Sequence, residues 1–127
     1  MGASTLVTFD IENGDSVIKA LDDDGKAPDV VLWAKLPDYE DRRLVLASEH
    51  LDQSSPHAGY SQIIAAMDKA GIPNHRRPSI LLRPIKNPMI QALRNTFASA
   101  KDTRGMRLGG QQFGDKYLED AVVYRIR

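Results

Sequence analysis

Two carboxylates near the start of the chain have a spacing that could hold a metal ion. Asp10 and Glu12 lie at the end of segment 5–11, in which the alternation of Phe9 and Ile11 predicts a β-strand. Side chains two residues apart on a strand point to the same face, and paired carboxylates bind Mg²⁺ together with water and substrate phosphate. A Mg-dependent phosphodiesterase using Asp10 and Glu12 is therefore one function to consider, against the simpler interpretation of a solvated strand end.

The densest basic stretch supplies a second candidate site, formed by Arg76, Arg77, Arg83 and Lys86. Guanidinium groups suit bidentate contacts with phosphate. A helix predicted to begin at Pro88 would add the free N–H groups of its first turn beside Lys86. If the four cations lie together and are exposed, they predict an anion-binding surface and a nucleic-acid partner. If they pair with acids, they are ordinary surface charges.

His57 is the third candidate, because histidine is the side chain whose ordinary pKa lies near neutrality. It follows the Ser-Ser-Pro of 54–56, but the chain has no Gly-x-Ser-x-Gly nucleophile elbow. The histidines at 50, 57 and 75 lack the spacing of a helical zinc site, and the absence of cysteine excludes thiolate catalysis, disulfides and cysteine zinc sites. We therefore predict no metal and no cofactor, list His57 with the basic residues as a ligand-binding candidate, and leave open whether the chain is an enzyme.

Length and composition are typical of one globular domain spanning 1–127, with 42% hydrophobic and 27% charged residues. No apolar run approaches the roughly 20 residues of a membrane-spanning helix, and no signal peptide is visible, so we expect a soluble cytoplasmic protein with no membrane partner. The net charge is zero, yet 1–54 holds 12 acids and 5 bases, whereas 55–127 holds 5 acids and 12 bases. Either the two halves interleave and neutralise each other, or they form two faces of opposite charge.

The hydrophobic pattern predicts the element order βαββαβ-αββ. Strands are expected over 5–11, 29–36, 42–48, 79–85, 106–113 and 121–126, and helices are expected to begin near Asp15, Tyr60 and Pro88. This order indicates a single α+β domain with a mixed or mostly antiparallel sheet of five or six strands and about three helices, whose first six elements could form a ferredoxin-like core. The apolar run 29–36 predicts a central strand covered on both faces.

The inward phases of these elements predict a buried core. Its members are Val30, Leu32, Leu44, Leu46, Ile63, Ile64, Met67, Ile80, Leu82, Leu93, Phe97 and Val122.

The leading functional interpretation is a small soluble binding or interaction module without catalytic activity, which recognises an unknown protein or small molecule. It depends on the absence of an assembled catalytic set. The alternative is a phosphate-directed protein that binds nucleic acid or cleaves it with Mg²⁺. An open sheet edge at the final strand, together with the opposite charges of the two halves, also predicts a homodimer.

Overall fold

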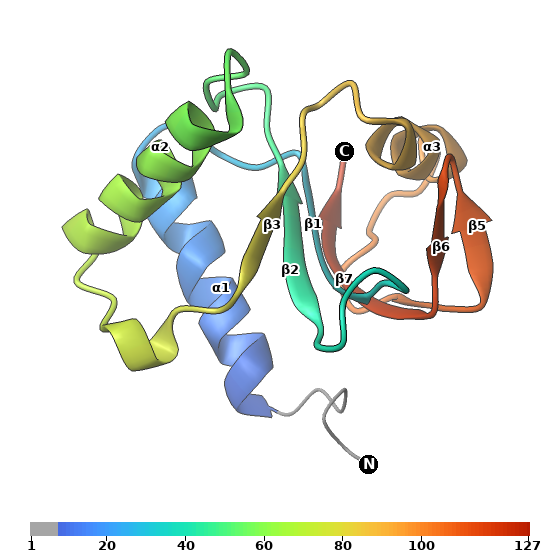
Figure 1. Ribbon diagram of the computed structural model, residues 1–127, viewed down its shortest axis with the longest axis horizontal. Helices are drawn as coiled ribbons and strands as arrows, with labels where there is room; N and C mark the ends of the chain where they lie inside the picture. The colour runs from blue at the N-terminus through green and yellow to red at the C-terminus, as the bar shows by residue number, and fades with distance from the viewer. Residues whose placement is uncertain (1–7) are drawn as a thin grey trace.

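A computed structural model describes residues 8–127 of the chain (Figure 1). Its helical elements are α1 (Thr8–Asp23), α2 (Pro56–Lys69), the short 3-10 helix η2 (Asn74–Arg76) and α3 (Pro88–Thr96). Its strands are β1 (Val30–Lys35), β2 (Arg43–Ala47), β3 (Ile80–Leu82), β4 (Arg107–Leu108), β5 (Gln111–Phe113), β6 (Lys116–Leu118) and β7 (Asp120–Ile126).

Five of the strands form one mixed sheet in the order β3-β2-β1-β7-β4, and β5 pairs with β6 in a separate hairpin. All neighbours in the large sheet are antiparallel except β2 and β3, which are parallel. The expected α+β class with a mixed sheet is therefore confirmed. The final strand β7 lies inside the sheet, so the expectation that it forms an open edge was wrong: β4 covers its outer side.

Helices cover both faces of this sheet (Figure 1). On one face, apolar residues of α1 and α2 pack against Val31 and Trp33 of β1. On the other face, α3 and the β5–β6 hairpin pack against Val30 and Leu32 of the same strand. The run 29–36 is thus the doubly covered central strand that its composition predicts. The ferredoxin-like core, which would place its helices on one face, gains no support from this arrangement.

The strand expected over 5–11 is the main error, because the chain is helical from Thr8 onward; positions 5–7 lie outside the described residues. Asn13 and Gly14, expected to end a strand, are buried inside α1. Position 14 requires glycine, because the Tyr124 ring of β7 occupies the space that a Cβ would need. The Tyr124 hydroxyl also donates a hydrogen bond to the Ile11 carbonyl at 2.5 Å. Tertiary packing across 113 residues therefore overrides the local strand propensity.

Local capping signals position the other two helices. The Ser55 side chain accepts a hydrogen bond from the Ala58 N–H, so α2 begins at Pro56, before the expected start near Tyr60. The Asn87 side chain accepts from Met89 and Ile90, and α3 begins at Pro88 as predicted. The strand expected over 106–113 is divided at Gly109–Gly110 into β4 and β5, which belong to different sheets.

Most of the predicted core is buried, but for several helix or strand residues the side predicted to face the core was wrong. Ile64 is 48% exposed, because Ile63 rather than Ile64 faces the sheet. Four other members, Ile80, Leu82, Phe97 and Val122, are only half-buried. Among residues 8–127, the structure contains no helix with both the length and the apolar character needed to cross a bilayer.

Candidate ligand-binding pocket

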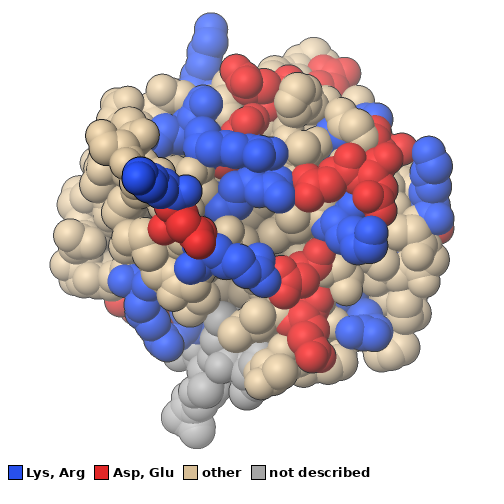
Figure 2. Space-filling view, turned by 180° about the vertical axis from the view of Figure 1, so that it is seen from behind, with Lys and Arg blue, Asp and Glu red and all other residues tan. Residues whose placement is uncertain are grey.

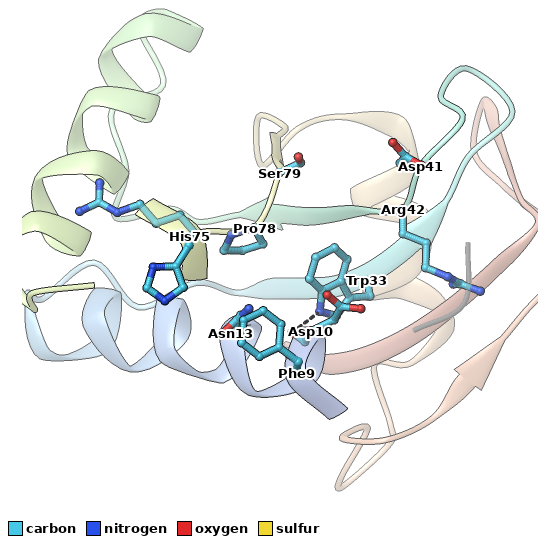
Figure 3. A pocket seen from close by; sticks show the side chains of 10 residues that line it. Phe9, Asp10, Asn13, Trp33, Asp41, Arg42, His75, Pro78 and Ser79 are labelled. Carbon is cyan, nitrogen blue, oxygen red and sulfur yellow. Dashed lines mark hydrogen bonds between the residues drawn. The ribbon is translucent and has the colours of Figure 1, made fainter. Parts of the chain in front are cut away.

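A pocket of about 250 Å³ opens between the first half of α1, the strand β1 and the segment that leads into β3 (Figure 3). Four separate parts of the chain line it: Phe9, Asp10 and Asn13 from α1, Trp33 from β1, Asp41 and Arg42 from the loop before β2, and His75, Arg77, Pro78 and Ser79 from the approach to β3. It lies on the sheet face that α1 and α2 cover.

Aromatic side chains form the apolar part of this pocket. Trp33 is only 5% exposed, and its indole Nε1–H donates to the Asp10 carbonyl oxygen at 3.1 Å, which fixes the ring against α1 (Figure 3). Phe9 is 48% exposed, an unusual position for a large apolar side chain. The pocket therefore combines a rigid ring with a solvent-accessible one.

Several polar groups around these rings can accept hydrogen bonds. Asp10 and Asp41 contribute carboxylates, and Ser79 contributes a hydroxyl. The buried Asn13 side chain accepts a hydrogen bond from Arg76 Nε at 3.2 Å. The guanidinium of Arg76 also lies 5.8 Å from the centre of the Phe9 ring, so a cation of the chain itself already occupies the rim of the pocket.

The two arginines that line the pocket direct their charged ends to acids elsewhere. Arg77 pairs with Asp68 at 2.7 Å and donates from Nε to the Ile72 carbonyl at 2.8 Å. Arg42 pairs with Asp120 at 2.5 Å, and its side chain extends away from the Trp33 ring (Figure 3). The charged ends of both lining arginines are therefore held by acids outside the pocket.

The ion pairs of Asp120 hold the outer end of Arg42 in place. The Arg107 guanidinium, hydrogen-bonded to Asp120, lowers the pKa of this carboxyl to about 2, and Arg42 acts in the same direction. Partial burial opposes this shift without reversing it. Asp120 consequently remains charged at neutral pH and keeps Arg42 directed away from the pocket.

The four cations predicted to form one anion site lie apart. Arg76 and Arg77 precede β3, whereas Arg83 and Lys86 follow it, at the opposite end of the strand (Figure 1). Arg83 donates to the Leu82 carbonyl at 3.1 Å, and Lys86 is exposed. Only Arg77 of the four lines the pocket.

The start of α3 does not offer the free N–H groups expected beside Lys86. The Asn87 side chain accepts from Met89 and Ile90, and the Asn87 carbonyl accepts from Gln91. The turn of the β5–β6 hairpin also packs here, since a Cβ on Gly114 would lie 2.5 Å from the Pro88 carbonyl oxygen. Capping and packing therefore use the donors that an anion would need.

His57 stands exposed in the first turn of α2 and does not line the pocket. The neighbouring Ser55 is the helix cap, so its hydroxyl has a structural role. His75 is the histidine that the structure places at the pocket, and the sequence analysis did not single it out as a site.

The expected geometry of Asp10 and Glu12 was also wrong. Both residues are on the helix α1, where side chains two residues apart do not face each other. Asp10 lines the pocket, whereas Glu12 is exposed outside it. Within 8–127, no three His, Cys, Asp or Glu side chains are grouped so that they could hold a metal ion.

Opposite charges of the two sequence halves interleave in the fold, as the simpler interpretation predicts. Viewed from behind, positive and negative side chains alternate over the surface and do not form one basic face (Figure 2). Ion pairs join the halves at Asp15–Arg104, Asp22–Arg125, Asp24–Lys69, Asp38–Lys116, Lys35–Glu119 and Arg42–Asp120.

No protein-family model, curated protein or solved structure matches this chain.

Pocket residues that the sequence analysis missed carry weak individual signals. Trp33 is the single tryptophan of the chain, but its place in an apolar strand is equally typical of a core residue. Asp41 and Ser79 stand in ordinary polar connections. Only the pairing of β1 with β2 and of β2 with β3 brings these three positions to one end of the sheet.

Proposed function

We propose that this protein is a binding module without catalytic activity, and that its ligand is held in the pocket formed by α1, β1 and the approach to β3. The observation that carries the proposal is the meeting of Trp33 and Phe9 with the carboxylates of Asp10 and Asp41 in one concave site. Binding sites commonly combine an apolar lining with a few convergent polar groups that orient the ligand.

The chemistry of the pocket suits recognition better than catalysis. A nucleophile needs a base within hydrogen-bond reach, and none of the histidine side chains in the described part of the chain hydrogen-bonds a serine. The lining groups supply ring surfaces together with hydrogen-bond donors and acceptors, which can orient a bound group. A small molecule or one side chain of a protein partner fits a pocket of this size.

The phosphate-directed alternative has less support. An anion site needs cationic or N–H donors that converge on one point, whereas Arg77 is paired with Asp68 and Arg42 with Asp120. The separation of Arg76 and Arg77 from Arg83 and Lys86 along β3 also weakens the case for a continuous surface for nucleic acid.

The single tryptophan provides the test, because Trp33 reports on the pocket without a label. We would titrate the protein with a panel of positively charged, neutral and negatively charged small molecules, exciting the indole at 295 nm. Binding in the pocket predicts a saturable change in Trp33 emission for at least one class of compound.

Matched variants connect such a change to the pocket. Ser79→Phe places a bulky ring in the opening, whereas Ser61→Phe makes the same change at an exposed position of α2 outside the pocket. We expect Ser79→Phe to abolish the emission change and Ser61→Phe to retain it. A panel in which no compound alters Trp33 emission, or in which both variants respond as the wild type does, would contradict the proposal.

A further inference from the structure

We infer that the guanidinium group of Arg43 binds a carboxylate group of a ligand, at a site on the face of the sheet opposite to the pocket. Arg43 begins β2 and alternates with Val45 and Ala47, which are buried in the core that α3 and the β5–β6 hairpin cover. The pocket lies on the other face, so this inference goes beyond the proposed function and does not depend on it.

Arg43 differs from the other partly buried arginines in having no oxygen acceptor. Its guanidinium makes no hydrogen bond or ion pair with residues 8–127, although its side chain is partly buried. The other partly buried arginines of that range each donate to an oxygen atom: Arg42, Arg76, Arg77, Arg83, Arg94 and Arg125. Donors that leave water without gaining an acceptor destabilise a fold, and a bound anion would supply acceptors to this guanidinium.

The accessible part of the guanidinium is the edge formed by its two terminal nitrogens. The Nε atom of Arg43 is buried and has no partner among the described residues, whereas Nη1 and Nη2 are not enclosed in this way. A ligand therefore approaches the guanidinium at the edge between Nη1 and Nη2. Two parallel N–H donors at this edge match the two oxygens of a carboxylate, in the planar bidentate geometry that arginine favours.

The ring of Tyr39 holds the guanidinium in this orientation. The Arg43 Cζ atom lies 4.4 Å from the centre of the ring, within the range of a cation–π contact. Tyr39 is itself held in place, because it packs against the core beneath α3 and its carbonyl accepts from the Lys35 Nζ at 2.6 Å. The two donors are thus preorganised, so little side-chain entropy is lost when a ligand binds.

The charges near Tyr39 favour a carboxylate over a phosphate. The polar connection that carries Tyr39 also contains Asp38, Glu40 and Asp41. These acids repel a phosphate dianion more strongly than a monoanionic carboxylate at the same place, because the Coulomb energy is proportional to the charge. Lys116 is already paired with Asp38 at 2.8 Å. The single unpaired guanidinium of Arg43 therefore suits a ligand group with a single negative charge.

The test uses acetate as the probe, with chloride as the reference anion at equal ionic strength. The buried Nε–H of Arg43 is shielded from exchange with water, so its signal can be followed in a ¹H–¹⁵N spectrum of the full chain near neutral pH. Arg43→Lys identifies this signal by its loss. We expect acetate to shift the signal saturably, chloride to leave it unmoved and inorganic phosphate to bind more weakly than acetate.

Variants of two tyrosines connect the shift to the stacked guanidinium. Tyr39→Leu removes the ring and keeps an apolar side chain at a partly buried position, whereas Tyr117→Leu makes the same change at an exposed position of β6. We expect Tyr39→Leu to weaken acetate binding by about two- to fivefold, the factor that corresponds to an exposed cation–π contact. Tyr117→Leu should leave acetate binding unchanged.

Thermal unfolding gives a second readout that does not need the Arg43 signal. A ligand that binds only the folded chain raises its unfolding midpoint, so the wild type should unfold at a higher temperature in acetate than in chloride. Arg43→Lys keeps the charge without the planar fork and should lose most of this difference. Arg83→Lys should retain it, because the Arg83 guanidinium already donates to the Leu82 carbonyl.

Butyrate and a capped Gly-Glu-Gly peptide distinguish the source of the carboxylate, because both carry it on a short alkyl chain. Tighter binding of the peptide indicates an acidic side chain of a protein partner, and tighter binding of butyrate indicates a free carboxylic acid. The inference is overturned if acetate shifts the Arg43 signal no more than chloride does, if phosphate binds more tightly than acetate, or if Tyr39→Leu binds acetate as tightly as the wild type.

Discussion

The hydroxyl of Tyr60 accepts a hydrogen bond from the backbone N–H of Leu82 at 2.8 Å, and so an α2 side chain satisfies an outward donor of the edge strand β3. The same hydroxyl donates to the Ile80 carbonyl at 3.1 Å. Edge strands with unpaired N–H and C=O groups invite pairing with other chains. Tyr60 thus occupies backbone groups of β3 that would otherwise be open to pairing with a second chain. The homodimer, which was predicted from an open sheet edge, stays a prediction that a measurement of the mass in solution would test.

Removing this hydroxyl is expected to weaken the edge. In Tyr60→Phe, the Leu82 N–H and the Ile80 carbonyl lose their partner while the ring remains, so the free energy of unfolding should fall by about 1–2 kcal/mol. Urea unfolding measures the loss, and faster amide exchange at Leu82 locates it. Tyr117→Phe, at an exposed position of β6, serves as the control and should change neither. Equal stability of the two variants would show that the Tyr60 hydroxyl does not stabilise the edge.

Adjacent isoleucines on α2 test which face of the helix is buried. Ile63 is 1% exposed and Ile64 is 48% exposed. Ile63→Ala should therefore lower the free energy of unfolding by about 2–5 kcal/mol, through lost burial and the cavity that remains. Ile64→Ala should change it by less than about 0.5 kcal/mol. Denaturant unfolding of the two variants gives the comparison, and similar losses would mean that α2 is rotated relative to this account.

Position 114 requires glycine for two reasons, its positive φ angle and its close contact with α3, and a comparison with Gly25 separates them. Both have positive φ angles, of +60° at Gly114 and +73° at Gly25, but only a Cβ at Gly114 would collide with backbone, namely the Pro88 carbonyl. Gly25→Ala should cost about 1–2 kcal/mol for the backbone conformation alone. Gly114→Ala should cost clearly more, because the hairpin must also move away from α3. Thermal unfolding decides, and equal midpoints would exclude close packing of the hairpin on α3.

Acid should remove the contribution of Asp120 to stability. Its pKa in the fold is about 2, below the ordinary 3.8, because Arg107 and then Arg42 stabilise the charged form. A lowered pKa stabilises the fold above the ordinary pKa, and this contribution is lost as pH falls from about 4 to about 2. Asp120→Asn should therefore be less stable than the wild type at pH 6 and should lose less stability over that interval. Urea unfolding at several pH values tests this, and parallel pH profiles would contradict it.

The sequence predicted correctly those elements whose start or pairing depends on residues close together in the chain. Asn87-Pro88 defines the start of α3 because the cap needs only residues within one turn. The hairpin of β1 and β2 follows from two apolar runs and a polar connection. By contrast, Phe9 and Ile11 alternate as in a strand, yet their segment is a helix, and Gly14 of this helix packs against Tyr124, which is remote in sequence.

The site was less predictable than the fold, because its chemistry is assembled from distant segments. Asp10 was predicted from the sequence to bind a metal ion together with Glu12. In the structure, both residues are on the helix α1 and their side chains do not face each other. The charge of Arg77 suggested an anion, whereas its pairing with Asp68 removes that role. Which charges remain available at a site depends on ion pairs formed across the fold, and a linear sequence does not specify these.

The most direct test of the central claim is a ligand titration followed through the emission of Trp33, the single tryptophan of the chain. The account predicts a saturable change in this emission for at least one class of small molecule, lost in Ser79→Phe at the opening of the pocket and kept in Ser61→Phe at an exposed position of α2. Equal responses of the two variants, or no response to any compound, would contradict the account.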